Sequence, residues 1–358
     1  MIIIMKTDAT EEQIDHVINE FEDRGFDTHL SEGEQKTVIG IIGDTHKLSQ
    51  GPVESMDGVE QAMKVQKPYK LASREFHPKD STVQVDDVEI GGEEVVIMAG
   101  PCSVESYDQM LESAEAVKKA GAKVLRGGAY KPRTSPYSFQ GLGEEGLEIM
   151  KNVAEETGLK MVTEVMGPNQ VEQIGEFTDI FQLGARNMQN YNLLRAVGRT
   201  DTPVLLKRGF RSKIDEFLLA AEYIMNEGNE DVILCCRGIR TFDRAHTRNT
   251  MDINAVAVLN KLSHLPVVMD PSHGTGKRDL VPAGARAAVA AGADGLLVES
   301  HRNPENALSD GPQQLPPEMF SDVMDQLRDV ASAVGRTIQE PLEEEQSSDE
   351  STPAAVSS

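Results

Sequence analysis

The stretch Val95-Val96-Ile97-Met98-Ala99-Gly100-Pro101-Cys102-Ser103 is an apolar run that ends in a glycine, a proline and two polar side chains. Seven more short apolar runs follow it, and segments with helical spacing separate them. Such alternation is typical of parallel strands joined by crossover helices. Eight strands, spaced by roughly 30 residues as this architecture requires, predict a (β/α)8 TIM barrel over residues 95–337.

The predicted strands of this barrel are 95–102, 123–128, 160–165, 180–185, 203–207, 232–237, 266–270 and 295–299. A doubly wound open sheet is the alternative α/β fold, but it would gather its ligand at one switch point. In this chain, side chains with functional chemistry follow nearly every predicted strand. We therefore predict that the strand ends converge on a single site at the barrel mouth.

A small ferredoxin-like α+β domain is predicted in residues 1–70, before the barrel. Its order is β-α-β-β-α-β, with elements at 1–6, 11–24, 27–33, 36–43 and 58–65, followed by a last strand. Thr10 and Gln13 form a predicted capping box for the first helix, and Gly25 ends it.

Composition restricts the class of protein. The net charge of −24 makes nucleic acid and anionic membrane surfaces improbable partners. No apolar stretch approaches the roughly 18 to 20 residues of a membrane span, and three cysteines cannot build a disulfide framework, so a cytoplasmic location is expected. Residues 71–94 are predicted as a linker with a barrel-closing hairpin, and residues 338–358 as a disordered acidic tail.

Cations at the strand ends stand out against the acidic composition. They are Arg126, Lys131, Arg133, Arg186, Lys207 and Arg237. Burying like charges together costs free energy unless anions neutralise them, so the pattern predicts two phosphorylated substrates. For part of the basic stretch, pairing with surface carboxylates is an equally good interpretation, namely for Arg211, Arg237, Arg240, Arg244 and Arg248.

Four candidate metal ligands also fall at this mouth: Cys102, His273, Glu299 and Asp310. One sulfur, one imidazole and two carboxylates suit a divalent ion such as Mn2+, Fe2+, Co2+ or Zn2+. Each residue alone has an ordinary structural interpretation, but their shared position favours a metal site. Cys236 is interpreted as a packing thiol and not as a further ligand.

Long motifs give the sequence a resemblance that spans the chain to about residue 335. They are 99–103 (AGPCS), 131–135 (KPRTS), 184–187 (GARN), 206–209 (LKRG), 237–241 (RGIRT) and 270–273 (DPSH). The sequence resembles the 3-deoxy-D-arabino-heptulosonate 7-phosphate (DAHP) synthases, of the type I beta-like group with an N-terminal ACT-like, ferredoxin-like regulatory domain.

The resemblance implies a metal-dependent condensation of phosphoenolpyruvate with erythrose 4-phosphate and water, which gives DAHP and phosphate. This is the first step of the shikimate pathway to the aromatic amino acids. One alternative is the related 3-deoxy-D-manno-octulosonate 8-phosphate synthase, which uses arabinose 5-phosphate. Another is a barrel without catalysis that senses a metabolite.

The resemblance also implies roles for single residues. Arg126, Lys131, Arg186, Lys207 and Arg237 would hold phosphoenolpyruvate. Pro132, Arg133, Thr134 and Ser135 would position erythrose 4-phosphate. Cys102, His273, Glu299 and Asp310 would bind the metal. The expected catalytic residues are Lys131, Cys102, His273 and Glu164.

Regulation and assembly are implied in the same way. His29 and Ser31 match effector-binding positions of the family's regulatory domain, where tyrosine or phenylalanine binds at subunit contacts that cover the barrel mouth. A domain that serves assembly alone is the alternative. A homotetramer is expected from the resemblance.

Overall fold

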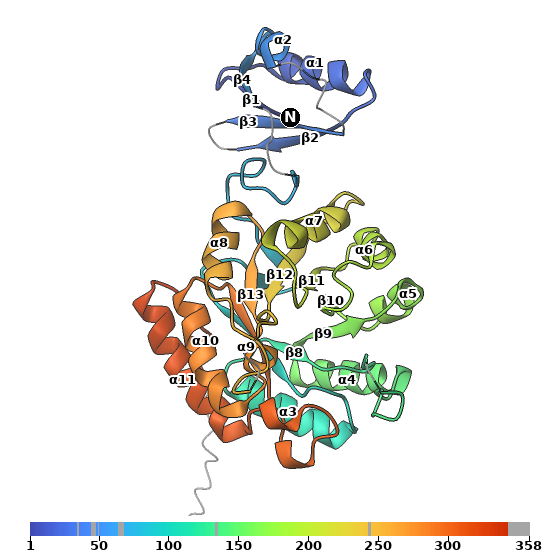
Figure 1. The fold of residues 1–358 in the computed structure, drawn as a ribbon, viewed down its shortest axis with the longest axis vertical. Coiled ribbons are helices and arrows are strands. Elements are labelled where there is room, and N and C mark those ends of the chain that lie inside the picture. The colour runs from blue at the N-terminus through green and yellow to red at the C-terminus, as the bar shows by residue number, and fades with distance from the viewer. Residues whose placement is uncertain are drawn as a thin grey trace, which may run out of the picture.

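The computed structural model describes residues 1–33, 36–43, 48, 50–63, 68–132, 135–242 and 245–342. A small α+β domain lies at one end, and a closed eight-stranded barrel ringed by helices forms the rest (Figure 1). The predicted fold class is therefore confirmed. Among the described residues, no helix has the length and apolar character needed to cross a membrane.

The small domain is an antiparallel sheet with its helices on one face. Its strands are β1 (Ile2–Met5), β2 (Asp27–Glu32), β3 (Thr37–Ile42) and β4 (Val59–Met63), in the order β2-β3-β1-β4, and its helices are α1 (Glu11–Glu22) and α2 (Gln50–Glu54). Alternate residues of β1 face opposite sides, so Ile3 packs with the helices and Ile2 belongs to the barrel-side cluster. The predicted capping box of Thr10 and Gln13 is present.

The predicted helix at 58–65 is wrong, because Val59–Met63 form strand β4 and the second helix lies earlier in the chain. The three-residue spacing of Val59 and Ala62 fits a helical face. However, β4 pairs antiparallel with β1, where Ile3 lies opposite Ala62. Pairing with a neighbouring strand overrides such a weak local pattern.

The barrel contains all eight predicted strands, several of them shortened at their ends. They are β7 (Val96–Gly100), β8 (Val124–Arg126), β9 (Lys160–Val165), β10 (Ile180–Leu183), β11 (Val204–Lys207), β12 (Val232–Cys236), β13 (Val267–Met269) and β14 (Gly295–Glu299). Neighbouring strands pair in parallel all the way around, and β14 closes onto β7.

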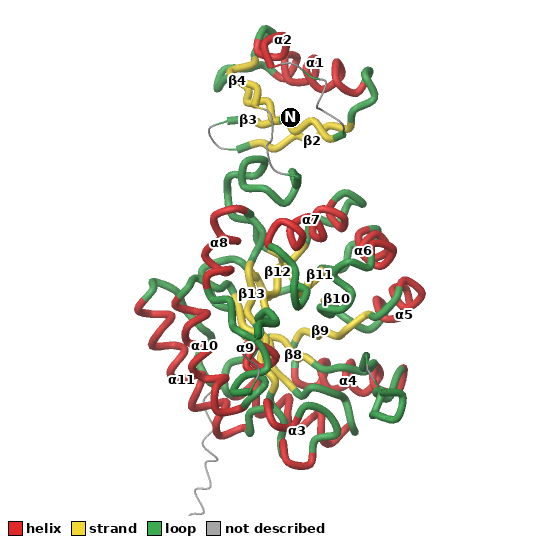
Figure 2. The backbone as a smooth tube through the Cα atoms, in the orientation of Figure 1, coloured by secondary structure: helices red, strands yellow, loops and turns green. Residues whose placement is uncertain are grey.

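Helices surround this barrel (Figure 2). They are α3 (Tyr107–Lys119), α4 (Glu144–Thr157), α5 (Val171–Gly175), α6 (Tyr191–Gly198), α7 (Ile214–Met225), α8 (Asn254–Leu262), α9 (Pro271–Thr275), α10 (Val281–Ala290) and α11 (Pro317–Ala333). Short 3-10 helices are η2 (Pro168–Gln170), η3 (Arg278–Leu280), η4 (Pro304–Asn306) and η5 (Gly311–Gln313).

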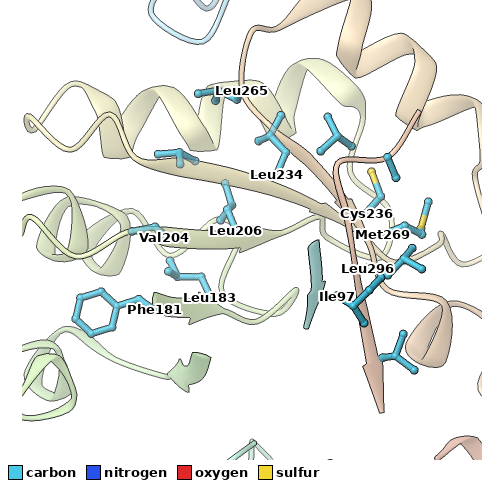
Figure 3. Packing of buried hydrophobic residues seen from close by; sticks show 14 of the residues in the cluster. Ile97, Phe181, Leu183, Val204, Leu206, Leu234, Cys236, Leu265, Met269 and Leu296 are labelled. Carbon is cyan, nitrogen blue, oxygen red and sulfur yellow. The ribbon is translucent and has the colours of Figure 1, made fainter. Parts of the chain in front are cut away.

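Two apolar layers hold the barrel together. Between strands and helices, residues such as Phe181, Leu206 and Leu296 pack in one continuous cluster (Figure 3). Inside the barrel, alternate strand residues meet the hairpin of β5 (Val83–Val85) and β6 (Val88–Ile90). The hairpin thus fills the end where the strands begin, and the polar site lies at the end where they finish.

The linker after the small domain is fastened to the barrel by Glu222 of α7. Its carboxylate accepts backbone N–H groups of Lys70, Leu71 and Ala72 at 2.9–3.0 Å. Phe76 is buried here, and a Cβ on Gly40 would lie 1.6 Å from its ring. Glycine at this position of β3 therefore permits the close approach of the two parts of the chain.

The start of the predicted tail requires a correction. Ile338 is buried, and the Leu342 N–H donates to the Lys119 carbonyl at 3.0 Å. The Gln339 carbonyl accepts from the Arg328 guanidinium at 2.9 Å. Residues 338–342 consequently pack against the barrel, because Ile338 offers an apolar side chain and α11 offers donors. Residues 343–358 lie outside the described part of the chain.

His264 is buried at the junction with the linker. Its Nε2 lies 2.7 Å from the Leu71 carbonyl and its Nδ1 lies 2.7 Å from Ser81 Oγ. The carbonyl requires a donor, so Nε2 carries the proton and Nδ1 accepts from the serine. Burial lowers the pKa of His264 to about 4.

We expect the contribution of His264 to the free energy of unfolding to be fully present above pH 6.5, the ordinary His pKa. It should be lost progressively as the pH falls towards 4, because only the unfolded chain binds the proton readily. The full loss is on the order of 3 kcal/mol. Urea midpoints at pH 7 and pH 5 test this. His264→Gln keeps an amide donor for Leu71 without titrating, and it should show a smaller loss. An equal loss in both proteins would contradict the assignment.

Candidate active site

The strand ends converge on a cavity of about 350 Å3. The side chains that the motifs assign to phosphoenolpyruvate all line it: Arg126, Lys131, Arg186, Lys207 and Arg237. Arg126 ends β8, Lys207 ends β11 and Arg237 follows β12, so residues far apart in sequence share this space. The excess of cations favours an anionic ligand.

Two of these guanidinium groups keep unused donors in the interior. The Nε atoms of Arg126 and Arg237 are buried and have no hydrogen-bond partner among the described residues. Arg126 otherwise binds the Pro101 carbonyl and Glu299 Oε1 through Nη1, at 3.0 and 2.8 Å. Burial lowers the pKa of Arg237, so its charge is incompletely compensated. A bound phosphate or carboxylate would satisfy such donors.

Phe210 organises the outer part of the cavity. Three guanidinium groups stand over its ring, at 4.4 Å for Arg240, 4.7 Å for Arg237 and 5.8 Å for Arg186. The aromatic face attracts cations and holds their planes in place. The sequence offered no signal for Phe210, because an isolated phenylalanine after a strand resembles an ordinary core residue.

Three of the four predicted metal ligands come together. The donor atoms of Cys102, Glu299 and Asp310 all lie within 4.8 Å of one another. The Cys102 Sγ lies 3.4 Å from Asp310 Oδ2. His273 lies beside this group, with Nε2 at 3.4 Å from Glu299 Oε1. A thiol, two carboxylates and an imidazole in this arrangement fit a divalent transition ion.

Asp270 prepares His273 for such a role. Its Oδ2 lies 2.7 Å from His273 Nδ1, and its Oδ1 accepts the His273 backbone N–H at 2.8 Å. Burial lowers the pKa of His273, which keeps the imidazole neutral and leaves the Nε2 lone pair for a ligand. Oδ2 also pairs with Lys207 Nζ at 2.7 Å. The sequence showed Asp270 at a strand end, but it did not show that this carboxylate orients His273.

Lys131 stands next to the predicted metal group. Its Nζ lies 2.7 Å from the Cys102 carbonyl and 3.2 Å from Cys102 Sγ. Burial, with the negative charge of Glu299, raises the pKa of the Cys102 thiol to about 11. A metal ion bound here would release the thiol proton, so its affinity would rise with pH.

The pKa of Glu299 moves in the opposite direction. Burial alone would raise it, but the interactions with the His273 imidazole and with the positive charge of Arg126 outweigh burial and lower it to about 2. Glu299 is thus a carboxylate at neutral pH. The buried Arg126–Glu299 pair joins a predicted substrate residue to a predicted metal ligand.

Glu164 also lines the cavity. Gln182 Nε2 lies 3.4 Å from its Oε2, and a Cβ on Gly184 would lie 2.0 Å from its Oε1. The glycine of the GARN motif therefore leaves room for this carboxylate. Of the residues predicted for erythrose 4-phosphate, Pro132 and Ser135 line the cavity, and Arg133 and Thr134 lie outside the described residues.

Of the basic residues with two interpretations, Arg237, Arg240 and Arg248 line the cavity, which favours the anion-binding interpretation for them. Arg237 is buried at the cavity, and Arg248 binds Gln313 Oε1 at 2.7 Å beside Asp310. Arg240 also lines the cavity, while Arg211 lies at a recess beside it. Arg244 lies outside the described residues. The predicted packing role of Cys236 agrees with its burial in the outer apolar cluster.

The predicted effector residues lie far from this cavity along the barrel axis. His29 and Ser31 belong to β2, an edge strand of the small domain. The His29 ring stacks on Phe76 at 4.8 Å, and its Nε2 lies 3.8 Å from Glu230 in the loop before β12. Within one chain, the small domain thus contacts the end of the barrel opposite the mouth.

Comparisons with known proteins agree with this geometry. Residues 68–335 match the model of the DAHP synthetase I family, and residues 1–67 match the DAHP synthase ferredoxin-like domain. The chain belongs to the DAHP synthetase I family. This family membership confirms the predicted resemblance.

The chain is 52% identical to the phospho-2-dehydro-3-deoxyheptonate aldolase of Thermotoga maritima over 335 residues, which are 94% of this chain and 99% of the relative. The crystal structure of the Thermotoga maritima enzyme matches with a TM-score of 0.76 at 50% identity. The match covers 94% of this chain and 99% of the Thermotoga chain. The 2-dehydro-3-deoxyphosphooctonate aldolase of Desulfosudis oleivorans is 32% identical over 68% of this chain and 93% of the relative. The predicted enzyme class, DAHP synthase, is thereby confirmed over its rival.

Proposed function

We propose that this chain condenses phosphoenolpyruvate with erythrose 4-phosphate and water, to give DAHP and phosphate, with a divalent metal ion held by Cys102, His273, Glu299 and Asp310. DAHP synthase activity follows from the family. The observation that supports these residue roles is a cavity lined by Arg126, Arg237 and Asp310, at which both arginines keep a buried Nε with no partner among the described residues. Asp310 in turn groups its donor atom with those of Cys102 and Glu299.

Phosphoenolpyruvate binds at the inner cations. Arg126, Lys207 and Arg237 surround the inner cavity and neutralise the carboxylate and phosphate. Arg186, over the Phe210 ring, contacts the phosphate from the outer side. This grip orients carbon 3 of the enol phosphate towards the aldehyde of the second substrate.

A metal ion at this site would act as a Lewis acid that polarises the aldehyde oxygen. Carbon 3 of phosphoenolpyruvate attacks the aldehyde carbon, and positive charge develops at carbon 2. Lys131 Nζ, 3.2 Å from Cys102 Sγ, donates a proton or hydrogen bond to the nascent alkoxide. Water adds to carbon 2, and phosphate leaves with cleavage of the carbon–oxygen bond. Glu164 orients this water.

The choice of aldose tests the function most simply. We expect kcat/KM for erythrose 4-phosphate to exceed that for arabinose 5-phosphate by about 100-fold or more, because the outer cavity grips the phosphate of the shorter sugar. Ser135 and Pro132 line that region, and the family motif adds Arg133 and Thr134 to it. Parallel assays of phosphate release measure the ratio. A preference for arabinose 5-phosphate would select the octulosonate synthase reaction.

We further propose that the small domain binds tyrosine or phenylalanine and thereby inhibits the barrel. The support is the family's ferredoxin-like domain and the exposed edge strand that carries His29 and Ser31. The amino acid should reduce turnover of the full chain severalfold. A Ser31→Ala variant should need more of the effector for the same inhibition, with unchanged turnover when none is added. Full activity at saturating tyrosine and phenylalanine would leave the domain an assembly role.

Two finer expectations accompany this proposal. A homotetramer is expected from the family and can be measured by light scattering of the full chain. A cytoplasmic location stays a prediction from composition.

A further inference from the structure

The loop between β14 and α11 carries two adjacent glutamines, which follow the predicted ligand Asp310 after two residues. Gln313 ends η5, and Gln314 follows it; their side chains are buried, with Gln314 fully so. Buried amides are costly unless both their oxygen and their nitrogen are bonded. The partners of these two amides are therefore informative.

Gln314 fastens two loops together. Its Oε1 accepts the Cys102 backbone N–H at 2.9 Å, and its Nε2 donates to the Ser309 carbonyl at 2.8 Å. The first bond is made by the backbone of Cys102 itself, and the second by the carbonyl of the residue that precedes Asp310. One side-chain amide thus fixes the distance between a thiol and a carboxylate that come from opposite ends of the barrel sequence.

Gln313 holds the third predicted metal ligand, Glu299, in a similar way. Its Nε2 donates to Glu299 Oε2, and its Oε1 accepts from Arg248 Nη1 at 2.7 Å. The same Arg248 nitrogen lies 3.6 Å from Asp310 Oδ1. Glu299 Oε1, in turn, is held by Arg126 at 2.8 Å. The Glu299 carboxylate is therefore bound on both oxygens and cannot rotate freely.

The backbone at Asp310 shows why fastening is needed. Its φ is +51°, and among the described residues only Asp86 shares a positive φ without being glycine. A left-handed conformation is unfavourable for a non-glycine residue and persists where the surroundings impose it. The Gln314 bond to the Ser309 carbonyl acts on the peptide that leads into this strained residue.

We propose that Gln313 and Gln314 are positioning residues that hold Cys102, Glu299 and Asp310 at the spacing a divalent ion requires. Neither amide needs to touch the ion or the substrates. The inference rests on the proposed metal site and goes beyond it, because it assigns the preorganisation of that site to two amides on one loop.

The first measurement is Co2+ binding by the full chain, followed by the thiolate-to-metal absorption band and by competition with a chromophoric chelator. Gln314→Met keeps the length of the side chain and removes both hydrogen bonds. It should weaken Co2+ binding by about 10- to 100-fold and alter the thiolate band. Gln314→Glu keeps the acceptor for Cys102 and loses the donor to Ser309, so an intermediate loss is expected. Gln313→Met should weaken binding similarly through Glu299.

A matched control separates positioning from folding. Asn229 is a buried amide at the loop before β12, where its Nδ2 donates to the Thr202 carbonyl at 2.8 Å. Asn229→Leu should lower the melting temperature and leave the Co2+ affinity and band unchanged. If both Gln314 variants bind Co2+ like the parent protein with the same band, the inference is wrong and the metal site stands. If the parent protein itself shows no thiolate band with Co2+, the proposed metal site fails, and the inference fails with it.

Discussion

Replacing Cys102 with alanine is expected to lower kcat by about a thousandfold or more, the largest effect of any single substitution in this chain. Cys102 supplies the only sulfur among the four predicted ligands, and its Sγ lies 3.4 Å from Asp310 Oδ2. Without it, the aldehyde would lose its polarising group. Steady-state turnover at saturating substrates, with metal added in excess, measures the loss.

The matched control for this substitution is Cys235→Ala. Cys235 is also fully buried, but its side chain lies in the apolar cluster inside the barrel. Its replacement should cost about 1 kcal/mol of stability from the lost packing and leave kcat within about twofold. Metal-dependent turnover of Cys102→Ala at the parent rate would contradict the ligand assignment.

Replacing Lys131 with methionine should produce the second largest effect, a fall in kcat of about 100- to 1,000-fold. The ammonium group lies 2.7 Å from the Cys102 carbonyl. In the proposed mechanism, the alkoxide forms near this ammonium group, beside the predicted metal ligands. Methionine keeps the apolar stem and removes the proton. KM for phosphoenolpyruvate should rise less than kcat falls, because other cations share its binding.

Two further variants sharpen the assignment of Lys131. Lys131→Arg keeps the charge but fills the site with a wider, planar group, so it should recover little activity. Lys123 pairs with Glu94 near the start of β8 and serves as the control, since Lys123→Met should leave kcat unchanged. A Lys131→Met enzyme with the parent kcat and a raised KM would show a role in binding alone.

The barrel could be predicted from sequence because the sequence signals for its strands are local. Each strand is a short apolar run, and each functional side chain follows such a run in the chain. Gly184, for example, belongs to a readable motif at the end of a strand, and the structure shows that it makes room for Glu164. The strand order then follows from the closed, parallel architecture alone.

Other features depend on partners that the sequence does not reveal. The strand Val59–Met63 looks helical until β1 is known to lie beside it. Ile338 looks like part of a tail until its burial is seen. Phe210 and Gln314 act through tertiary contacts between distant loops, and the residues next to them in the sequence do not indicate those contacts.

The most direct measurement is phosphate release by metal-stripped protein with phosphoenolpyruvate and erythrose 4-phosphate, with and without added Mn2+. The structure brings Cys102, Glu299 and Asp310 together beside the cations of the cavity, so negligible release without metal and full turnover with it is the expected result. Equal turnover in the stripped protein, with a chelator present, would contradict the metal-dependent mechanism.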